Sequence, residues 1–480
     1  MLVSTSVYSD LQLSELFSDH TVLQRDAPVP IWGFGDPGTQ LSVSFAGQNV
    51  NAVVDETGRW TATLRPLKLN KQPQELVVKS GQTVLTRRDI LVGDVWLCGG
   101  QSNMNMTFKT PRLPCDMPAF INADKHPTIR HMAVLPRRNK DTAPIGRFHP
   151  SQIKQGWTVC NADTALGFTA TGFFFAYTLA EELDVPIGLL NITQGNTRID
   201  MWMSPKSAET IADEVPTESL RAVYSKTPFT NYRWQIEPAA GFAIKGAIWY
   251  QGEANAKEGD QYMWKMKALI SGWREAWGQG DFPFYFVQLP SYENEKGNRT
   301  WAPIRDAQRK ALSIPNTGMA VLTDAGDTAE DFPINLHPRN KYAVGRRLAL
   351  WALAKDYGKD NLVYSGPLFQ SASPQGNTIA VRFDHVGSGL MAAKKTSSRS
   401  NDPPRPVDEL KGFMIAGEDK QWAEAAATIQ GDTVVLSSDQ VDQPIAVRYL
   451  YTMNTDHGTL YNKEGLPASP FRTDDWPNKR

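Results

Sequence analysis

Four short polar segments follow apolar runs of the chain, and each carries a residue type suited to acyl transfer. They hold Ser102 in "GGQSNM", Gly195 in "NITQGNT", Gln251 in "WYQGEAN" and His337 in "INLHPRNK". A serine hydroxyl is a weak nucleophile that needs a neighbouring base, and a histidine is the usual base. Backbone N–H groups and side-chain amides can hold an oxyanion. Together the four segments indicate a serine hydrolase site.

The elements around these segments alternate between short strands and helices. Helical spacing of apolar residues predicts helices over 170–183, 260–277, 304–312 and 341–357. Apolar runs such as "DVWLC", "PIGLLNIT", "KGAIWY", "FPFYFVQL" and "GMAVLTD" predict strands between them. Such alternation is typical of a parallel sheet with helices on both faces. Because sites in these folds lie at the carboxyl ends of the strands, we expect the four segments to meet there.

A β pattern precedes and follows this alternation. "LSVSF" and "RWTATL" alternate apolar and polar residues between Gly, Asn and Asp turns, which predicts a small sandwich at the start of the chain. Alternation returns in "TIAVRF" and "TVVLSS" near the end. We therefore expect three parts: an N-terminal β-sandwich-like domain over 1–92, an α/β domain over 93–360 and a C-terminal β region over 361–480.

The composition excludes several classes of protein. The chain has 480 residues, with 50 basic against 51 acidic ones, so we expect no nucleic-acid partner and no anionic membrane partner. No run approaches the 18 apolar residues that a spanning helix needs. Three cysteines without short spacing indicate neither a disulfide framework nor a zinc site, and there is no HExxH motif. We expect no metal and no cofactor, and Cys98 as a small buried residue; the oligomeric state stays open.

The start of the chain bears on the compartment. "MLVSTSVYSDLQLSELFSDH" has neither a basic start nor an apolar stretch, so no signal peptide is visible. We expect a cytoplasmic protein, or a periplasmic or secreted one if a signal has been removed. A bacterial source is our expectation, and for that reason the three N-glycosylation sequons receive no weight.

Several motifs resemble one family. "GDVWLCGGQSNM", "WYQGEAN" and "HPRNKYAVGRRLAL" resemble the sialate O-acetylesterase family, a branch of the SGNH hydrolases that acts on acetylated carbohydrates. "LFSDHTVLQRDAPVPIWGFGDPG" and "LYNKEGLPASPFRTDDW" extend the resemblance over nearly the whole chain. The resemblance implies a flavodoxin-like three-layer α/β/α SGNH hydrolase domain with flanking β modules.

The resemblance also implies a role for each motif residue. Ser102 matches the nucleophile, and its own N–H joins the oxyanion hole with Gly195. Gln251 falls in the block whose side-chain amide completes the hole, and Asn255 is the second choice for that donor. His337 matches the general base.

The third member of the triad departs from the family pattern. The pattern has an aspartate three residues before the histidine, where this chain has Ile334. Asp331 in the acidic loop is our first choice for the carboxylate, with Glu330 and Asp327 as alternatives. A backbone carbonyl or Asn335 in its place would leave a Ser–His dyad.

Three further residues are candidates for binding substrate. Trp202 either stacks on a sugar ring or packs in the core, Glu253 either binds a sugar hydroxyl or orients its neighbours, and Arg198 suits the carboxylate of a sialic acid. The expected function is a serine esterase that removes O-acetyl groups from carbohydrates, with sialate as first choice. Acetylated plant polysaccharides such as xylan or xyloglucan are the alternative substrate, and a non-catalytic glycan-binding protein is the alternative class.

Overall fold

The computed structural model describes most of the chain. The described residues are 11–110, 115–137, 146–221, 228–292, 301–326 and 336–476. The three candidate acids, Asp331, Glu330 and Asp327, lie outside the described residues, as do Ile334 and Asn335. Within the described ranges no helix is long and apolar enough to cross a membrane.

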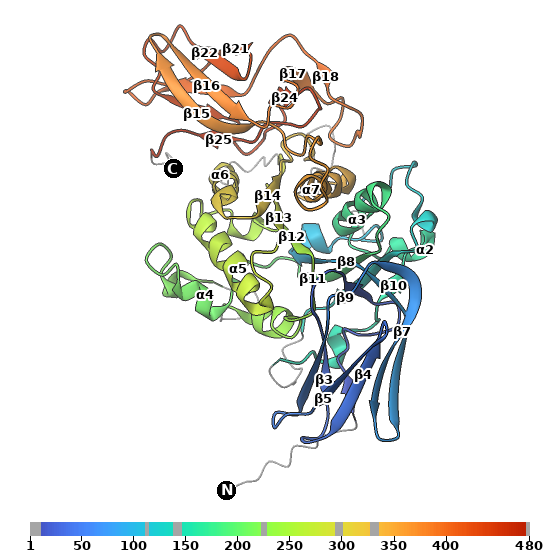
Figure 1. Cartoon of the computed structure of the whole chain (residues 1–480). Helices are drawn as coiled ribbons and strands as arrows, with labels where there is room; N and C mark the ends of the chain where they lie inside the picture. Colours follow the sequence, from blue (N-terminus) through green and yellow to red (C-terminus); the bar gives the residue numbers. More distant parts are fainter. Residues whose placement is uncertain are drawn as a thin grey trace.

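A largely parallel sheet forms the middle of the molecule (Figure 1). In spatial order its strands are β10 (Thr158–Val159), β9 (Ile129–Val134), β11 (Ile187–Thr193), β8 (Thr83–Gly100), β12 (Gly246–Tyr250), β13 (Phe284–Val287) and β14 (Thr317–Ala320). Only the edge pair of β10 and β9 is antiparallel along this path. Without that edge pair, the other five strands have the order 2-1-3-4-5 found in flavodoxin-like sheets.

The central strands are almost entirely buried because helices pack on both of their faces. The helices of this domain are α1 (Ser102–Asn105), α2 (Ala162–Ala165), α3 (Ala170–Glu182), α4 (Pro205–Glu209), α5 (Gln261–Trp277), α6 (Ala302–Lys310) and α7 (Lys341–Asp356). On one face Trp96 of β8 contacts Phe175 of α3, which packs beside α7. On the other face Gly99 of β8 lies against Trp273 of α5. Residues 96 and 99 point to opposite faces because side chains alternate along a strand.

The sequence patterns located the long helices and most of the strands of this domain. The expected helices over 170–183, 260–277 and 341–357 correspond to α3, α5 and α7 within one residue at each end, and 304–312 is shifted by two residues from α6. Strand β9 was missed. Its sequence, "IRHMAV", carries Arg130 and His131, and these polar residues interrupt the apolar run although both are buried.

The N-terminal β region continues into the central sheet. Its strands are β1 (Gln12–Leu13), β2 (Val22–Gln24), β3 (Val29–Phe34), β4 (Gln40–Phe45), β5 (Gln48–Val53), β6 (Arg59–Leu64) and β7 (Asn70–Ser80). The long strand β8 pairs first with β7 and β2 and then with β11 and β12. The expected boundary between residues 92 and 93 therefore falls inside β8, and one continuous core serves both parts.

The C-terminal β region has its own hydrophobic core and consists of antiparallel sheets among the described residues. The first sheet contains β15 (Leu368–Gln375), β16 (Thr378–Asp384), β22 (Thr433–Ser437) and β21 (Ala426–Gln430). The second contains β18 (Arg405–Pro406), β17 (Leu390–Lys394) and β24 (Leu460–Asn462). The third contains β20 (Trp422–Glu424), β19 (Phe413–Ala416), β23 (Ala446–Tyr449) and β25 (Phe471–Arg472).

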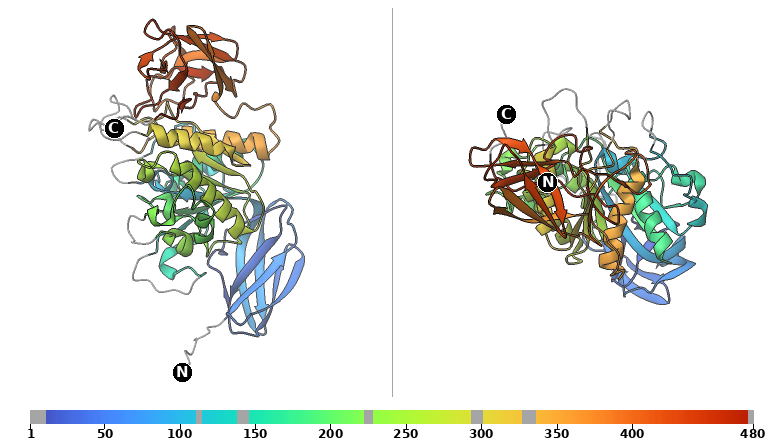
Figure 2. Two further views of the ribbon diagram at one scale, coloured as in Figure 1. Left: turned by 90° about the vertical axis from the view of Figure 1, so that its left-hand side faces the viewer. Right: turned by 90° about the horizontal axis from the view of Figure 1, so that it is seen from above.

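The two β regions lie at opposite ends of the α/β domain, as Figure 1 and the left view of Figure 2 show. The C-terminal region is attached through the fully buried guanidinium of Arg305 on α6. This group donates to the carbonyls of Leu289 at 2.9 Å and of Met453 at 2.9 Å, so it joins the central sheet to the C-terminal region. Burial lowers the pKa of Arg305 to about 9.

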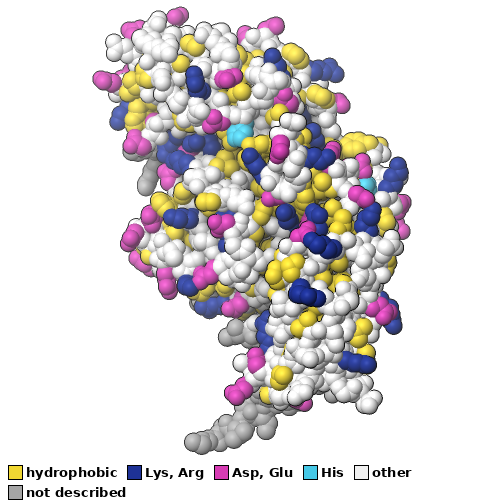
Figure 3. All heavy atoms as spheres, in the orientation of Figure 1, with side chains coloured by type: hydrophobic (Ala, Val, Ile, Leu, Met, Phe, Trp, Pro, Cys, Tyr) yellow, Lys and Arg dark blue, Asp and Glu magenta, His cyan; other side chains and the backbone are white. Residues whose placement is uncertain are grey.

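Charged side chains of both signs are mixed on the face of the molecule drawn in Figure 3. On the face drawn in Figure 3, lysines and arginines are interspersed with aspartates and glutamates. This distribution agrees with the nearly equal numbers of basic and acidic residues in the chain.

Candidate active site

The first strand end carries Ser102 because two glycines let the chain turn between crowded neighbours. A Cβ at Gly99 would lie 2.7 Å from the ring of Trp273, and one at Gly100 would lie 2.2 Å from the carbonyl oxygen of Tyr250. Gly100 also has a φ of +132°, which disfavours other residues. The chain then starts α1 directly, with Ser102 as its first residue.

The ends of three strands lie side by side at this point. Thr193 at the end of β11 and Tyr250 at the end of β12 are both paired with Gly100 at the end of β8. The segments that follow these strands, which contain Gly195, Gln251 and Ser102, are therefore brought to the same edge of the sheet. This is the arrangement that the strand–helix alternation predicted.

The base comes from the segment just before α7. His337 Nε2 lies 2.9 Å from Ser102 Oγ, within hydrogen-bond distance. Burial, together with the nearby Lys341 ammonium, lowers the pKa of His337 to about 4. The imidazole is therefore neutral at pH 7 and able to accept the serine proton.

Gly195 lies beside the nucleophile. A side chain at this position would point toward Ser102, with its Cβ 3.8 Å from the serine Cβ, so glycine keeps this space open. Among the described residues, no hydrogen bond uses the backbone N–H of Ser102 or of Gly195. Two donors are thus available next to the serine, where an oxyanion would form.

A cavity of about 750 Å³ contains this pair of residues. Five of the residues singled out from the sequence line it: Ser102, Gly195, Arg198, Glu253 and His337. The remaining lining residues are Gln101, Asn196, Ala254, Ala256, Lys257 and Leu336. The cavity has the size of a pocket for a small ligand.

The two predicted side-chain amide donors do not line this cavity. Gln251 is fully buried, and its Nε2 donates to Gln101 Oε1 at 3.1 Å, to the Thr197 carbonyl at 3.0 Å and to Asn255 Oδ1 at 2.8 Å. Asn255 is equally buried, and its Nδ2 donates to two carboxylates, those of Asp200 and Glu258. Both amides are engaged in joining the strand-end loops, so the structure offers backbone N–H groups rather than these side chains to an oxyanion.

Trp202 is a core residue and not a platform for a sugar. Its side chain is fully buried, its Nε1 donates to Thr197 Oγ1 at 3.0 Å, and its ring packs edge-on against Trp249. A ring without an open face cannot stack on a substrate. Of the two roles considered for Trp202, the structure supports core packing and corrects the sugar-binding assignment.

Arg198 lines the cavity, but its charge is already paired. The guanidinium contacts the carboxylate of Glu258, lies 3.5 Å from Asp200 and donates to the Ala254 carbonyl at 3.1 Å. The buried Lys265 ammonium lies 2.7 Å from both carboxylates. These two cations balance the two carboxylates, so Arg198 stabilises the cavity wall and has little charge left for a substrate carboxylate.

Asn103 is a functional residue that the sequence reasoning missed. It is fully buried, and its Nδ2 donates to Glu253 Oε1 at 2.5 Å and to the Leu336 carbonyl at 3.1 Å, while its Oδ1 accepts from the buried ammonium of Lys341. It therefore connects α1, which begins with Ser102, to the residues around His337 and to the segment that follows β12. Its place directly after the serine in "GQSNM" was the available signal.

Glu253 lines the cavity, and one of its carboxylate oxygens has no hydrogen-bond partner among the described residues. Its Oε2 is buried, and among the described residues no hydrogen bond reaches it. Burial raises the pKa of Glu253, although the bond from Asn103 and the Lys341 ammonium act in the opposite direction. An unpaired buried acceptor costs free energy, and a ligand hydroxyl would satisfy it.

The described residues contain no group of three His, Cys, Asp or Glu side chains placed to hold a metal ion. The three cysteines are free and buried, and Cys98 is fully buried as expected. Burial raises the pKa of Cys98 and Cys115, which keeps both thiols protonated.

Comparison with known proteins places this site in a class. The family model described as "Carbohydrate esterase, sialic acid-specific acetylesterase" matches residues 92–353. Sialate O-acetylesterase of Homo sapiens is 31% identical over 398 residues, covering 74% of this chain and 73% of that protein. The Mus musculus protein of the same name is 30% identical, covering 76% of this chain and 77% of its own length.

A solved structure agrees with these relatives. A carbohydrate acetylesterase from Xanthomonas citri is 36% identical, with a TM-score of 0.83 and coverage of 97% of this chain and 100% of that chain. The chain is thus a carboxylic ester hydrolase that acts on acetyl groups of carbohydrates. It belongs to the family of sialic acid-specific acetylesterases among the carbohydrate esterases. Because the relatives are mammalian as well as bacterial, they do not support the expectation of a bacterial source.

Proposed function

We propose that this esterase removes O-acetyl groups from sialic acids through an acyl-enzyme on Ser102, with the three-layer SGNH architecture as its catalytic domain. The observation that carries the proposal is the 2.9 Å contact between His337 Nε2 and Ser102 Oγ inside the cavity. Nucleophile and base within hydrogen-bond reach are the mark of covalent catalysis by serine.

The reaction proceeds in two halves. In the first, Ser102 Oγ attacks the acetyl carbonyl carbon while His337 Nε2 takes the serine proton, and the N–H groups of Ser102 and Gly195 stabilise the oxyanion. The C–O bond to the sugar then breaks, and His337 returns the proton to the sugar oxygen. In the second half, water loses a proton to His337 and attacks the acetyl-serine, which releases acetate and restores the serine.

The imidazolium formed in each half needs a stabilising partner. A carboxylate that accepts from the other ring nitrogen would both fix the tautomer and stabilise the charge. Asp331, with Glu330 and Asp327 as alternatives, remains our prediction for this carboxylate.

The sugar portion is held by the remaining wall of the cavity. Glu253 Oε2, a buried acceptor without a described partner, suits a sugar hydroxyl. For a sialic acid, the carboxylate needs a cation, and Lys257 is the exposed lysine that lines the cavity. We assign Lys257, in place of the paired Arg198, to the sialate carboxylate.

A second candidate substrate, a neutral acetylated polysaccharide such as xylan, is favoured by one observation. Arg198 shares the carboxylates of Asp200 and Glu258 with Lys265, so the exposed Lys257 is left as the cation for an acidic sugar. A neutral sugar would need only hydroxyl partners such as Glu253.

Acetate release separates the two substrates. Purified enzyme is assayed on O-acetylated sialic acid and on acetylated xylo-oligosaccharides, with Ser102→Ala as the blank. Lys257→Met should raise KM for the sialate by about tenfold, the loss of roughly one charge-assisted hydrogen bond. Release from the xylo-oligosaccharide alone would exclude the sialate assignment, and release that persists in Ser102→Ala would exclude Ser102 as the nucleophile.

A further inference from the structure

Asn340 connects the segment that carries His337 to the C-terminal β region. Its Oδ1 accepts from the Ala343 N–H at 2.9 Å and so caps the start of α7. Its Nδ2 lies 3.3, 3.3 and 3.4 Å from the carbonyl oxygens of residues 398–400. The buried side chain of Asn340 therefore caps the helix next to His337 and also contacts a loop of the C-terminal β region.

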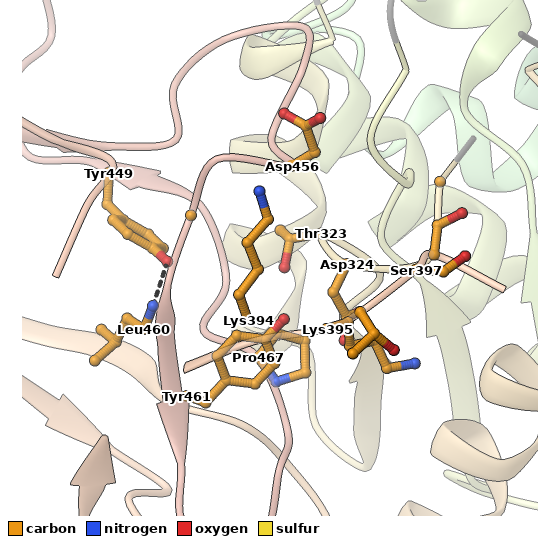
Figure 4. A pocket seen from close by; sticks show the side chains of 14 residues that line it. Thr323, Asp324, Lys394, Lys395, Ser397, Tyr449, Asp456, Leu460, Tyr461 and Pro467 are labelled. Carbon is orange, nitrogen blue, oxygen red and sulfur yellow. Dashed lines mark hydrogen bonds between the residues drawn. The ribbon is translucent and has the colours of Figure 1, made fainter. Parts of the chain in front are cut away.

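The loop that Asn340 contacts has a hydrogen bond of its own and lies beside an ion pair made by α7. Lys395 Nζ donates to the Ser400 carbonyl at 2.7 Å. Burial lowers the pKa of Lys395, but the Asp324 carboxylate opposes this shift. The two terminal nitrogens of the Arg347 guanidinium on α7, Nη1 and Nη2, donate to the Asp324 carboxylate at 2.6 and 2.8 Å. Asp324 and Lys395 line one small cavity of about 170 Å³ where the two regions meet (Figure 4).

The segment of the base has further contacts on the side of the catalytic domain. The Leu336 carbonyl accepts from Asn103, and the Arg339 carbonyl accepts from the Asp116 N–H at 3.3 Å. Asn340 adds the contact from the opposite side, three residues beyond His337. The segment that carries His337 is thus held between the nucleophile helix and the C-terminal β region.

We propose that the C-terminal β region positions the general base. Asn340 is the positioning residue, because its side chain contacts both the 398–400 loop and the start of α7. The proposal rests on the proposed role of His337 as the base. The Nε2–Oγ distance of 2.9 Å leaves little room for displacement, because a shift of about 1 Å moves the pair beyond hydrogen-bond reach. Misplacement of that size costs about 100-fold in rate. Since Asn103 still holds the other side of the segment, we expect about a tenfold loss.

Asn340→Ser tests this with a small neutral change. Serine still caps α7 through its hydroxyl, but it cannot span the distance to the three carbonyls. Asn462→Ser is the matched control: Asn462 Oδ1 accepts from the Leu466 N–H at 2.9 Å and its Nδ2 donates to the Ser365 carbonyl at 2.9 Å, within the C-terminal region. On an aryl acetate we expect kcat about tenfold lower in Asn340→Ser, KM within twofold of wild type, and kcat unchanged in Asn462→Ser.

A second variant leaves Asn340 and its cap of α7 unchanged. Lys395→Met removes the hydrogen bond within the loop from Lys395 Nζ to the Ser400 carbonyl, one of the three carbonyls that Asn340 contacts, so kcat should also fall. Because both changes act through one loop, the double variant should lose little more than the larger single loss. If the kcat of the double variant falls by the product of the two single losses, the two residues act independently, and the proposal that both act through one loop is overturned.

The outcomes separate this proposal from the proposed function. Activity that survives Ser102→Ala overturns the acyl-enzyme mechanism and with it the role of the base. Activity that depends on Ser102, but with equal kcat in Asn340→Ser and Asn462→Ser at a temperature where circular dichroism shows both folded, overturns the positioning role alone. A change confined to KM overturns it too, because a displaced base affects the chemical step.

Discussion

The low pKa of His337 predicts an unusual pH profile for kcat/KM. With a pKa of about 4, the imidazole loses activity only as the pH falls through 4, since protonation removes the base. At pH 5.5 about 97% of the ring would be neutral, against about 9% for a histidine at the ordinary value of about 6.5. The structure therefore predicts nearly full activity at pH 5.5, where an unperturbed base would have lost about nine-tenths.

The cause of the shift can be tested separately from its size. Burial is the larger cause and the Lys341 ammonium the second, so Lys341→Met should raise the midpoint of the acid limb. Lys355→Met is the matched control, because Lys355 lies on the same helix 14 residues further along, about 21 Å away. It should leave the midpoint unchanged.

The assay is kcat/KM on an aryl acetate between pH 3.5 and pH 8, with circular dichroism to establish that the protein is folded at each pH. A wild-type midpoint near 6.5 would refute the reasoning, because it would mean that another group, such as the predicted carboxylate at the other ring nitrogen, outweighs burial and Lys341 in the titration of the ring. A midpoint near 4 that Lys355→Met moves as far as Lys341→Met does would refute the local cause.

Three further predictions concern residues of the cavity and its support. Glu253→Gln removes the unpartnered acceptor and should raise KM for an acetylated sugar by about tenfold in steady-state assays; an unchanged KM would exclude this oxygen from sugar binding. Asn103→Ala removes the Oδ1 that accepts from the buried Lys341 ammonium and the Nδ2 that donates to Glu253, so urea unfolding should show a loss of about 3 kcal/mol, and wild-type stability would contradict the network. Trp202→Phe should lower the melting temperature but leave KM for the sugar unchanged; a raised KM would restore Trp202 to the substrate site.

Local patterns were enough to place the catalytic strand ends. Apolar runs and helical spacing are properties of neighbouring residues, so they located β8, β11 and β12 and the helices α3, α5 and α7. Parallel strands end at one edge, which brought Ser102 and Gly195 together. The residue type of His337 and its position before α7 then indicated the base, which the structure places 2.9 Å from the serine oxygen.

Contacts between distant parts of the chain decided the rest. Whether an amide faces a cavity or another loop depends on which neighbours surround it, and Gln251 proved to be engaged by three acceptors. Arg198 and Trp202 were assigned to substrate binding by residue type. In the structure Arg198 is paired with carboxylates and Trp202 is fully buried in the core, so neither is available for the role assigned to it. Asn340 contacts the carbonyls of residues 398–400, which lie about 60 positions further along the sequence. No local pattern contains such a contact, because it arises only when the C-terminal β region packs against α7.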